Sequence, residues 1–258
     1  MDSQVIVITG ASSGIGAALA KQLGAQGQRL VLAARRQAEL EKVAGPFGAN
    51  ALAVVTDVCR RGDVEHLRER ALEQFGQVDV WVNNAGRGIS RKVLELSDAD
   101  VDEMIAVNLK SALYGMQAIV PYFQQRGRGH LINVSSFLGR IPIVTPRSMY
   151  SASKAALNSL TANLRMDLRR DFPNIHVSLV FPGTTATDFS ANALGAAPGA
   201  GTVAGPAGAQ SAGDVAAAIV RLIDSPKPEI YTNPNNSPEF VARYYQDPGA
   251  FEANLNRP

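Results

Sequence analysis

The sequence is poor in cysteine and histidine. Cys59 is the single cysteine among 258 residues, which excludes an internal disulfide and a metal site built from cysteines. The three histidines show no metal-ligand spacing, so we expect no metal site; they are His66, His130 and His176. Such low cysteine usage is typical of a reducing compartment, and we expect a cytoplasmic location.

The sequence also lacks long apolar runs and an excess of charge. No run approaches the roughly 18–20 apolar residues of a membrane span, so we expect no membrane partner. The first residues lack the basic stretch of a signal peptide and lead straight into Val5-Ile6-Val7-Ile8. Lys plus Arg number 25 and Asp plus Glu number 23, and this balance argues against nucleic acid as a partner.

Short apolar runs alternate with helical patterns along the chain. The runs are rich in Val, Ile and Leu with little polar alternation, which is typical of strands buried on both faces of a parallel sheet. We predict strands over Gln4–Thr9, Arg29–Ala34, Ala51–Asp57, Val78–Asn83, His130–Ser135, Ile175–Phe181 and Glu229–Thr232. We therefore predict an α/β fold, a Rossmann-type doubly wound parallel sheet of about seven strands flanked by helices, in a single domain over residues 1–258.

Capping residues and glycines mark the helices between these runs. The spacing of Ile15, Leu19 and Leu23 predicts an amphipathic helix after the first strand. Further helices are predicted from the cap Asp63 to about Phe75, from the capping box at Ser97–Asp100 to about Gln125, from about Ser148 to Arg170, and from Ser211 or Gly213 onward. Each lies between two predicted strands, as the crossover connections of a parallel sheet require.

Two segments fall outside this alternation. Of residues 191–210, fifteen are Ala, Gly or Pro, and a long irregular segment after a strand end is typical of a functional lid. We predict a substrate lid over about 184–213, with a surface loop as the alternative. The C-terminal tail, about 231–258, is rich in Pro and Asn; the alternatives there are a cover over the pocket and an arm around a neighbouring subunit.

A glycine-rich turn joins the first predicted strand to its helix. The residues are Thr9-Gly10-Ala11-Ser12-Ser13-Gly14-Ile15-Gly16. Glycines at such a turn let the backbone approach a pyrophosphate, and the helix N-terminus supplies N–H donors and a partial positive charge. We therefore predict a dinucleotide-binding turn formed by Gly10, Ser12, Ser13, Gly14, Ile15 and Gly16.

The end of the second strand indicates which dinucleotide binds. NAD-binding proteins usually place an Asp or Glu there to hold the ribose hydroxyls, whereas this chain has Arg35 and Arg36. Guanidinium groups bind a 2′-phosphate, so we predict a preference for NADP(H), with NAD(H) as the alternative. Asp57 and Val58 close the third strand, where they would contact the adenine ring; a plain strand-end aspartate is the alternative.

Six motifs follow one another between Thr9 and about Leu222. They are the glycine turn above, Asn83-Asn84-Ala85-Gly86, Asn108, Ser135-Ser136, Tyr150-Ser151-Ala152-Ser153-Lys154 and Pro182-Gly183. Together they resemble the short-chain dehydrogenase/reductase family in its compact, single-domain form. The resemblance implies the fold predicted above, a nicotinamide cofactor, and hydride transfer between that cofactor and a carbonyl or alcohol.

Tyr150 and Lys154 are the predicted catalytic pair. They are four residues apart at the start of a helix and therefore share one face. A nearby ammonium favours the phenolate, so we expect Lys154 to lower the pKa of Tyr150, whose hydroxyl would exchange a proton with the substrate oxygen. Lys154 is also expected to hold the nicotinamide ribose.

A serine at the end of the fifth strand completes the expected catalytic set. Ser136 would hydrogen-bond the reacting oxygen from the carboxyl edge of the sheet. The resemblance favours Ser136 over Ser135 because the family's serine falls three residues before a glycine, here Gly139. Ser136 precedes Tyr150 by 14 residues, one more than is usual in the family, so Ser135 stays an alternative.

The remaining motif residues receive their roles from the resemblance. Asn108 would hold a water in a proton relay to Lys154, with a structural side-chain bond as the alternative. The expected neighbours of the adenosine ribose are Asn84, Ala85 and Gly86, with a turn-stabilising role for Asn84 as the alternative. The expected neighbours of the nicotinamide are Pro182, Gly183, Thr185 and Thr187, with Thr185 standing where the family usually has a branched aliphatic residue.

The leading interpretation is an NADP-dependent oxidoreductase that reduces a ketone or aldehyde or oxidises the matching alcohol. A non-catalytic nucleotide-binding regulator or scaffold is the alternative, although such a protein should lack the tyrosine or the lysine. An epimerase or dehydratase on a related fold also uses this tyrosine and lysine. Only 75 residues follow Gly183, however, which leaves little room for the C-terminal substrate domain of those enzymes.

The predicted substrate pocket is apolar and is lined by Ser136, Phe137, Leu138, Met149 and Phe189. The arginines near it either bind an acidic group or keep the surface soluble; they are Arg87, Arg91, Arg140 and Arg147. The resemblance also implies a homotetramer or homodimer, with the helices near Asp102–Gln125 and Tyr150–Arg170 at one interface.

Overall fold

Seven of the apolar runs form one parallel sheet. The computed structural model describes residues 3–196 and 208–255. The strand order is β3-β2-β1-β4-β5-β6-β9. The bounds are β1 Val5–Thr9, β2 Arg29–Ala34, β3 Ala51–Val55, β4 Val80–Asn83, β5 Gly129–Val134, β6 Ile175–Phe181 and β9 Glu229–Tyr231. With β2 on one side of β1 and β4 on the other, the sheet is doubly wound, which confirms the predicted fold class.

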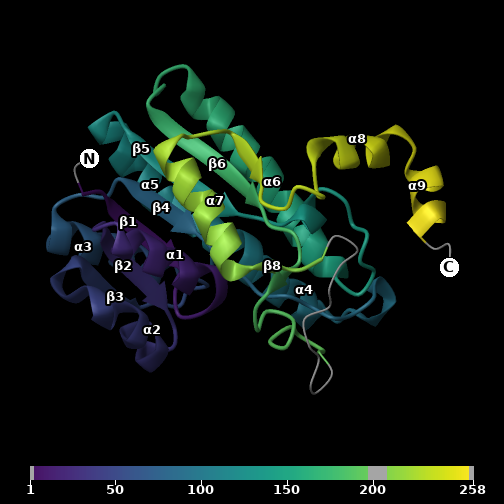
Figure 1. The fold of residues 1–258 in the computed structure, drawn as a ribbon, viewed down its shortest axis with the longest axis horizontal. Coiled ribbons are helices and arrows are strands. Elements are labelled where there is room, and N and C mark those ends of the chain that lie inside the picture. Colours follow the sequence, from purple (N-terminus) through teal and green to yellow (C-terminus); the bar gives the residue numbers. More distant parts are fainter. Residues whose placement is uncertain (1–2, 197–207, 256–258) are drawn as a thin grey trace.

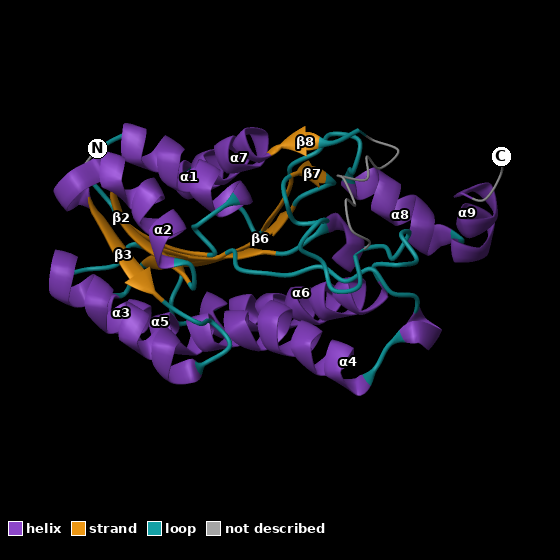
Figure 2. Ribbon diagram, turned by 90° about the horizontal axis from the view of Figure 1, so that it is seen from below, coloured by secondary structure: helices purple, strands orange, loops and turns teal. Residues whose placement is uncertain are grey.

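Helices cover both faces of the sheet (Figures 1 and 2). The bounds are α1 Gly14–Ala25, α2 Gln37–Ala44, α3 Arg61–Phe75, α4 Asp98–Ile105, α5 Ser111–Arg126, α6 Ser148–Arg169 and α7 Ala212–Asp224. Ile6 and Ile8 of β1 pack into a core with α1 and α7, whereas Val5 and Val7 pack into a second core with α3, α5 and α6. Burial on both faces explains why the strands are rich in Val, Ile and Leu.

The helix boundaries follow the predicted caps with one correction. α3 begins at Arg61, so Asp63 lies in its first turn and is not the cap. The Asp63 carboxylate instead accepts the backbone N–H of Asp57 at 3.1 Å, which fixes the loop after β3. Ser211 caps α7 through a hydrogen bond from the Asp214 N–H at 3.0 Å, which decides between Ser211 and Gly213.

The long helix predicted after Ser97 is interrupted. Ser97 and Asp100 form the predicted capping box, with the Asp100 N–H donating to Ser97 Oγ at 3.2 Å. Between α4 and α5, residues Ala106–Lys110 form a π-helical segment. Such segments are rare and often mark functional positions. Asn108 lies in the middle of this one, a feature that the sequence did not reveal.

The predicted lid is described in part. β7, Thr185–Ala186, pairs with β8, Gln210–Ser211, and Leu194 forms a bridge with Ile89 of the loop after β4. These contacts bring the described parts of the segment over the carboxyl edge of the sheet. Residues 197–207 lie outside the described part of the chain.

The C-terminal tail carries two helices that the sequence analysis missed. α8, Pro238–Gln246, and α9, Pro248–Leu255, project from the body beyond the end of α6 (Figure 1). Phe240 of α8 packs against Phe137 with ring centroids 5.9 Å apart, and the Tyr245 hydroxyl donates to the Arg140 carbonyl at 2.8 Å. The tail therefore contacts the segment that follows β5.

Among the helices in residues 3–196 and 208–255, none combines the length and the apolar character needed to cross a bilayer.

Candidate active site

The glycine turn is tightly folded against the end of β4. Gly10 and Gly14 have positive φ values of 67° and 55°. A Cβ on Gly10 would lie 2.8 Å from the Ala85 Cα, and one on Gly16 would lie 2.4 Å from the Gly10 carbonyl oxygen. Only glycine fits either position, and the resulting turn leads into the N-terminus of α1, with Ser13 as its N-cap and Ile15 packed against the core.

The Asn84 side chain stabilises this turn. Its amide donates to the Thr9 carbonyl at 2.9 Å and to the Gly10 carbonyl at 3.3 Å. The backbone N–H groups of Asn84 and Ala85 both donate to Thr9 Oγ1, at 3.0 and 3.1 Å. The turn-stabilising alternative for Asn84 is therefore the one that its contacts support. Gly86 lies close to the catalytic set, since a Cβ there would be 3.1 Å from Asn108 Oδ1.

The two arginines after β2 point to different places. The Arg36 guanidinium donates to Ser12 Oγ and Ser13 Oγ, both at 3.0 Å, so it lies against the glycine turn. Arg35 is exposed, and its charge acts on Cys59, whose pKa is raised mainly by burial and lowered slightly by Arg35. Of the two, only Arg36 is brought to the predicted dinucleotide site by a hydrogen bond.

The end of β3 lies beside Arg35 but is occupied by local contacts. Asp57 accepts the Cys59 N–H at 3.0 Å, as a strand-end aspartate does. Val58 is 9% exposed and packs into the core. The contacts of Asp57 match the alternative of a plain strand-end aspartate.

Ser136 and Tyr150 meet at the carboxyl edge of the sheet. The Ser136 side chain lies near enough to the Tyr150 hydroxyl to lower its pKa. Ser136 also caps the short helical turn at Phe137–Gly139 by accepting the Leu138 N–H at 3.1 Å. These contacts come from the loop after β5 and the first turn of α6, two elements that the parallel sheet places side by side.

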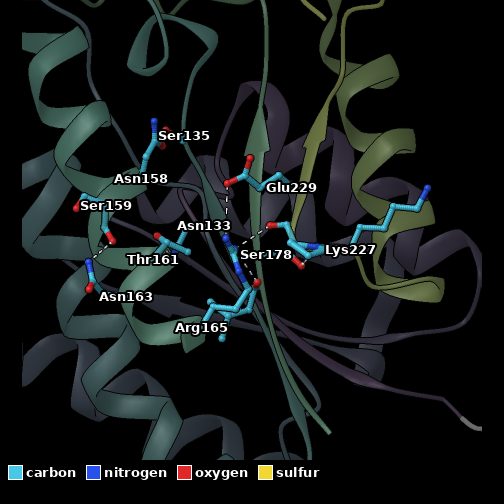
Figure 3. A network of polar contacts seen from close by, with 12 residues as sticks. Asn133, Ser135, Asn158, Ser159, Thr161, Asn163, Arg165, Ser178, Lys227 and Glu229 are labelled. Carbon is cyan, nitrogen blue, oxygen red and sulfur yellow. Dashed lines mark hydrogen bonds and ion pairs between the residues drawn. The ribbon is translucent and has the colours of Figure 1, made fainter. Parts of the chain in front are cut away.

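Ser135 points away from Tyr150. Its hydroxyl donates to Asn158 Oδ1 at 2.5 Å, and the two residues face each other in Figure 3. The Asn158 amide in turn donates to the Gly139 carbonyl at 2.9 Å. Ser135 thus ties β5 to α6, and the structure brings Ser136 rather than Ser135 to the tyrosine.

Lys154 is a buried cation one turn after Tyr150. Its ammonium donates to the Val134 carbonyl at 2.9 Å and lies 5.9 Å from the centroid of the Tyr150 ring. Lys154 is 3% exposed, and burial lowers its pKa from 10.5 to about 8. The ammonium form still predominates at pH 7, so the site keeps a positive charge beside the tyrosine.

The pKa of Tyr150 differs from the expectation. Burial raises it above the ordinary value of 10.0, because a buried phenolate loses its hydration. The Ser136 side chain and the charge of Arg147 act in the opposite direction, lowering the pKa of Tyr150. The expected lowering by Lys154 is therefore not what the structure gives: burial dominates, and the cation that acts on Tyr150 is Arg147.

The Asn108 side chain is hydrogen-bonded to other groups of the protein. Its Oδ1 accepts the Arg87 N–H at 2.9 Å, and its amide donates to the Arg87 carbonyl at 2.9 Å. The amide also donates to Ser153 Oγ at 3.2 Å. Asn108 thus braces the loop after β4 against α6, which is the structural alternative raised from the sequence.

The loop after β6 lies over the glycine turn. A Cβ on Gly14 would be 3.4 Å from the Thr187 methyl group. The Thr185 hydroxyl donates to the Gly183 carbonyl at 3.0 Å, and the Pro182 carbonyl accepts the Phe137 N–H at 2.9 Å. All four predicted nicotinamide neighbours therefore lie on one loop between the glycine turn and the Ser136 segment.

Most of the predicted substrate residues gather around Tyr150. Phe189 stacks edge-on against the Tyr150 ring with centroids 5.3 Å apart. Leu138, Met149 and Phe189 pack against a small apolar cluster that includes Tyr150. Phe137 does not join them, because it is buried against Tyr231 and Phe240 on the side of β9 and the tail.

Arg147 is the site residue that the sequence analysis undervalued. It directly precedes α6, and its guanidinium donates to the Ile89 carbonyl at 3.1 Å and to Ser190 Oγ at 3.0 Å. The guanidinium carbon lies 6.0 Å from the centroid of the Phe189 ring. A signal was available in the sequence, since the arginine stands three residues before the tyrosine at a helix start.

The described residues hold no group of three or more His, Cys, Asp or Glu side chains placed to bind a metal ion. His130 is buried and hydrogen-bonded to Ser178 Oγ at 2.8 Å, and burial lowers its pKa to about 3. This histidine is therefore a neutral core residue.

The chain resembles known proteins over most of its length. The sequence profile described as short chain dehydrogenase matches residues 4–196. An uncharacterized oxidoreductase of Staphylococcus epidermidis is 36% identical over 192 residues, which cover 72% of this chain and 82% of the relative.

Solved structures agree with this assignment. A short-chain dehydrogenase/reductase from Burkholderia phymatum in complex with NAD has a TM-score of 0.86 at 28% identity, covering 100% of this chain and 98% of that one. An alcohol dehydrogenase from Thermococcus sibiricus complexed with 5-hydroxy-NADP has a TM-score of 0.78 at 29% identity, covering 89% and 96%. Together with the glycine turn and the Ser136–Tyr150–Lys154 arrangement, these similarities show that the chain is an oxidoreductase of the short-chain dehydrogenase/reductase family.

Proposed function

We propose that the protein is an NADP-dependent reductase of a ketone or aldehyde carbonyl on a substrate with an apolar part, and that it oxidises the matching alcohol in reverse. The observation that carries this proposal is that the Ser136 side chain acts on the Tyr150 hydroxyl, with the Lys154 ammonium 5.9 Å from the centroid of the tyrosine ring. A proton donor and an oxygen-binding hydroxyl thus converge beside a dinucleotide-type turn.

The residues present fit a dinucleotide. The glycine turn offers a backbone surface with no side chain between it and a pyrophosphate, and α1 starts there with its partial positive charge. Thr187 borders the same turn from the loop after β6, and Thr185 lies on that loop, where its hydroxyl donates to the Gly183 carbonyl. The residues that would hold the cofactor are therefore those of the turn and this loop.

Arg36 supports the choice of NADP over NAD. Its recorded hydrogen-bond acceptors are the neutral hydroxyls of Ser12 and Ser13, and it makes no ion pair with a described residue. Its charge is free to meet a 2′-phosphate, which a guanidinium binds well. Arg35, one residue earlier, adds positive charge to the same edge.

When bound, the nicotinamide supplies the hydride. The Tyr150 hydroxyl donates its proton to the carbonyl oxygen, and Ser136 donates a hydrogen bond to the same oxygen. The raised pKa keeps Tyr150 protonated at neutral pH, as a proton donor must be. Lys154 keeps its positive charge 5.9 Å from the centroid of the Tyr150 ring, where its ammonium would hold the nicotinamide ribose, and Asn108 holds the loop after β4 in place.

The proposal is tested by measuring turnover with NADPH and NADH over a panel of ketones, aldehydes and quinones. We expect turnover with NADPH and a tenfold or larger preference for it over NADH. Arg36→Ala should lower kcat/KM for NADPH by about 10- to 100-fold, the value of a charge-assisted hydrogen bond, and leave NADH use unchanged. Arg35→Ala is the matched control and should have the smaller effect. Equal use of both cofactors by the unmodified protein would contradict the NADP assignment.

We also propose that the protein is a homodimer or homotetramer in the cytoplasm. An apolar hollow between α5 and α6, lined by Leu113, Val120, Leu160 and Leu164 among others, supports an interface there. Leu160 is 37% exposed although it is apolar. Light scattering after size exclusion should give a mass of two or four chains, and Leu160→Glu should lower it. The cytoplasmic location rests on the single cysteine of the sequence.

A further inference from the structure

Four arginines lie on the loops at the carboxyl edge of the sheet, and they differ in their partners. Three have a carboxylate: Arg87 pairs with Glu103, Arg91 with Asp100 and Arg140 with Glu229. Arg147 makes no ion pair with a residue in 3–196 or 208–255. The segment 197–207 contains neither Asp nor Glu. Arg147 is thus a half-buried cation without a carboxylate side chain from the lid or the described residues.

Hydrogen bonds hold the Arg147 side chain in place. It donates through Nη1 to the Ile89 carbonyl and through Nη2 to Ser190 Oγ, both neutral acceptors. A guanidinium has five N–H groups, and the remaining ones make no recorded hydrogen bond with a described residue. A cation that is already oriented and keeps free donors is well suited to bind an anion, because little side-chain entropy is lost on binding.

Arg147 lies near Tyr150, whose hydroxyl is the proposed proton donor. Both residues contact the Phe189 ring, whose centroid is 5.3 Å from that of Tyr150 and 6.0 Å from the Arg147 guanidinium carbon. The charge of Arg147 acts on Tyr150, as the lowering effect on the pKa of the tyrosine shows. A substrate whose carbonyl meets Tyr150 is therefore close enough to Arg147 for a second group to interact with its charge.

The surrounding charges are unfavourable for an unpaired arginine. Arg147 stands at the positive end of α6, a helix of 22 residues with no acidic residue in its first turn. Lys154 adds a second buried cation from the same helix. Burial lowers the pKa of Arg147, which shows that its charge loses hydration here. A bound anion would offset each of these costs.

We propose that Arg147 binds a carboxylate on the substrate, so that the natural substrates are oxo acids or the matching hydroxy acids. The proposal rests on the carbonyl–alcohol chemistry proposed above and adds the class of substrate. A spacer separates the carboxylate from the reacting carbon, and the apolar cluster around Leu138 and Met149 contacts the rest of the molecule.

The test compares acids with their methyl esters. The probes are 2-oxo-2-phenylacetate, 4-oxo-4-phenylbutanoate and 5-oxo-5-phenylpentanoate, each beside its methyl ester, which removes the charge and keeps the carbonyl. We expect the unmodified protein to favour at least one acid over its ester by about 10- to 100-fold in kcat/KM, as a bidentate charge-assisted pair would give. Arg147→Gln should abolish that preference, because KM should rise far more for the acid than for the ester.

A matched variant and a second measurement separate binding from structure. Arg140→Gln removes an arginine that is ion-paired, and Glu229 keeps Arg165 at 3.6 Å (Figure 3), so this variant should not change the ratio of acid to ester. Should Arg147→Gln fold poorly, Arg147→Lys keeps the charge and should retain part of the acid preference. In the unmodified protein, benzoate but not benzamide should inhibit reduction of a neutral ketone competitively.

The outcomes distinguish the two proposals. Reduction of esters and neutral ketones with no preference for any acid, or an equal loss of both activities in Arg147→Gln, would overturn the role of Arg147 and leave the reductase proposal standing. No turnover of acids, esters or neutral carbonyls with either cofactor would overturn the reductase proposal, and the substrate class with it.

Discussion

Lys154 allows a test of whether a buried charge in the active site lowers the stability of the folded protein. The residue is 3% exposed, its ammonium donates to the Val134 carbonyl, and no carboxylate in the described residues pairs with it. Replacing Lys154 by Met removes the charge and keeps an unbranched side chain of similar length. We expect Lys154→Met to be inactive and yet more stable than the unmodified protein at pH 7.

The magnitude follows from the pKa. Burial lowers it from 10.5 to about 8, and that difference corresponds to about 3 kcal/mol of unfolding free energy. A lysine with a depressed pKa in the folded state contributes stability above pH 10.5 and loses it as the pH falls through about 8. At pH 7 nearly the full cost applies, and the lost hydrogen bond to Val134 offsets about 1 kcal/mol of the gain. Lys154→Met should therefore gain about 2 kcal/mol at pH 7 and almost nothing at pH 10.

The assay is urea unfolding followed by circular dichroism at pH 7 and pH 10, without added cofactor. At pH 7 the gain corresponds to a rise in Tm of about 4–8 °C for a chain of this size. Lys21→Met, which removes an exposed lysine on α1, is the matched control and should show no such pH-dependent difference. An equal difference between Lys154→Met and the unmodified protein at both pH values would refute the buried-charge reasoning.

Three further predictions concern the glycine turn, the N-cap of α7 and the Asn108 side chain. Gly16→Ala places a Cβ 2.4 Å from a backbone oxygen of the glycine turn, so calorimetry should show dinucleotide binding lost, whereas Gly62→Ala in α3 meets nothing within 4 Å and should bind normally. Ser211→Ala removes the cap of α7 and should lower the unfolding free energy by about 1 kcal/mol in a thermal melt; no change would show that the cap is redundant. Asn108→Leu leaves two backbone groups of Arg87 unpaired and should lower the free energy of unfolding, measured in urea, by about 2 kcal/mol or more. Asn108→Asp keeps the acceptor and should therefore lose less stability.

The sheet could be predicted from the sequence because its strands are buried on both faces. Runs such as Val5–Thr9 and Ile175–Phe181 are mostly apolar, and that pattern has few alternatives when helical spacing lies between the runs. The glycine turn was equally readable, since Gly10 and Gly16 occupy positions where any Cβ would collide with backbone. These features depend on local chemistry, which a single sequence records.

Other features depend on contacts between distant segments. α8 is an amphipathic helix whose Phe240 packs on Phe137, about a hundred residues earlier in the chain. The helix was missed because the sequence around it is rich in Pro and Asn and does not record this distant contact. The pKa of Tyr150 was expected to fall because Lys154 is one turn away. It rises because tertiary packing buries the hydroxyl completely enough to outweigh nearby charge.

Arg147 shows the same limit at the candidate site. Four arginines near the pocket look alike in the sequence, and solubility was a reasonable interpretation of all of them. Three become ion pairs in the fold, and the fourth is left beside Phe189 without a carboxylate partner among the described residues. The positions of Glu103, Asp100 and Glu229, which lie on other elements, determine which arginine lacks a carboxylate partner.

The most direct measurement is NADPH-dependent reduction by Tyr150→Phe, with NADPH binding to the same variant measured by calorimetry. The substitution removes only the Tyr150 hydroxyl, the group on which Ser136 acts. If this hydroxyl is the proton donor, kcat should fall by about 10²- to 10⁴-fold while NADPH binding stays within about twofold. Undiminished turnover in Tyr150→Phe would contradict the assignment of Tyr150 as the catalytic acid.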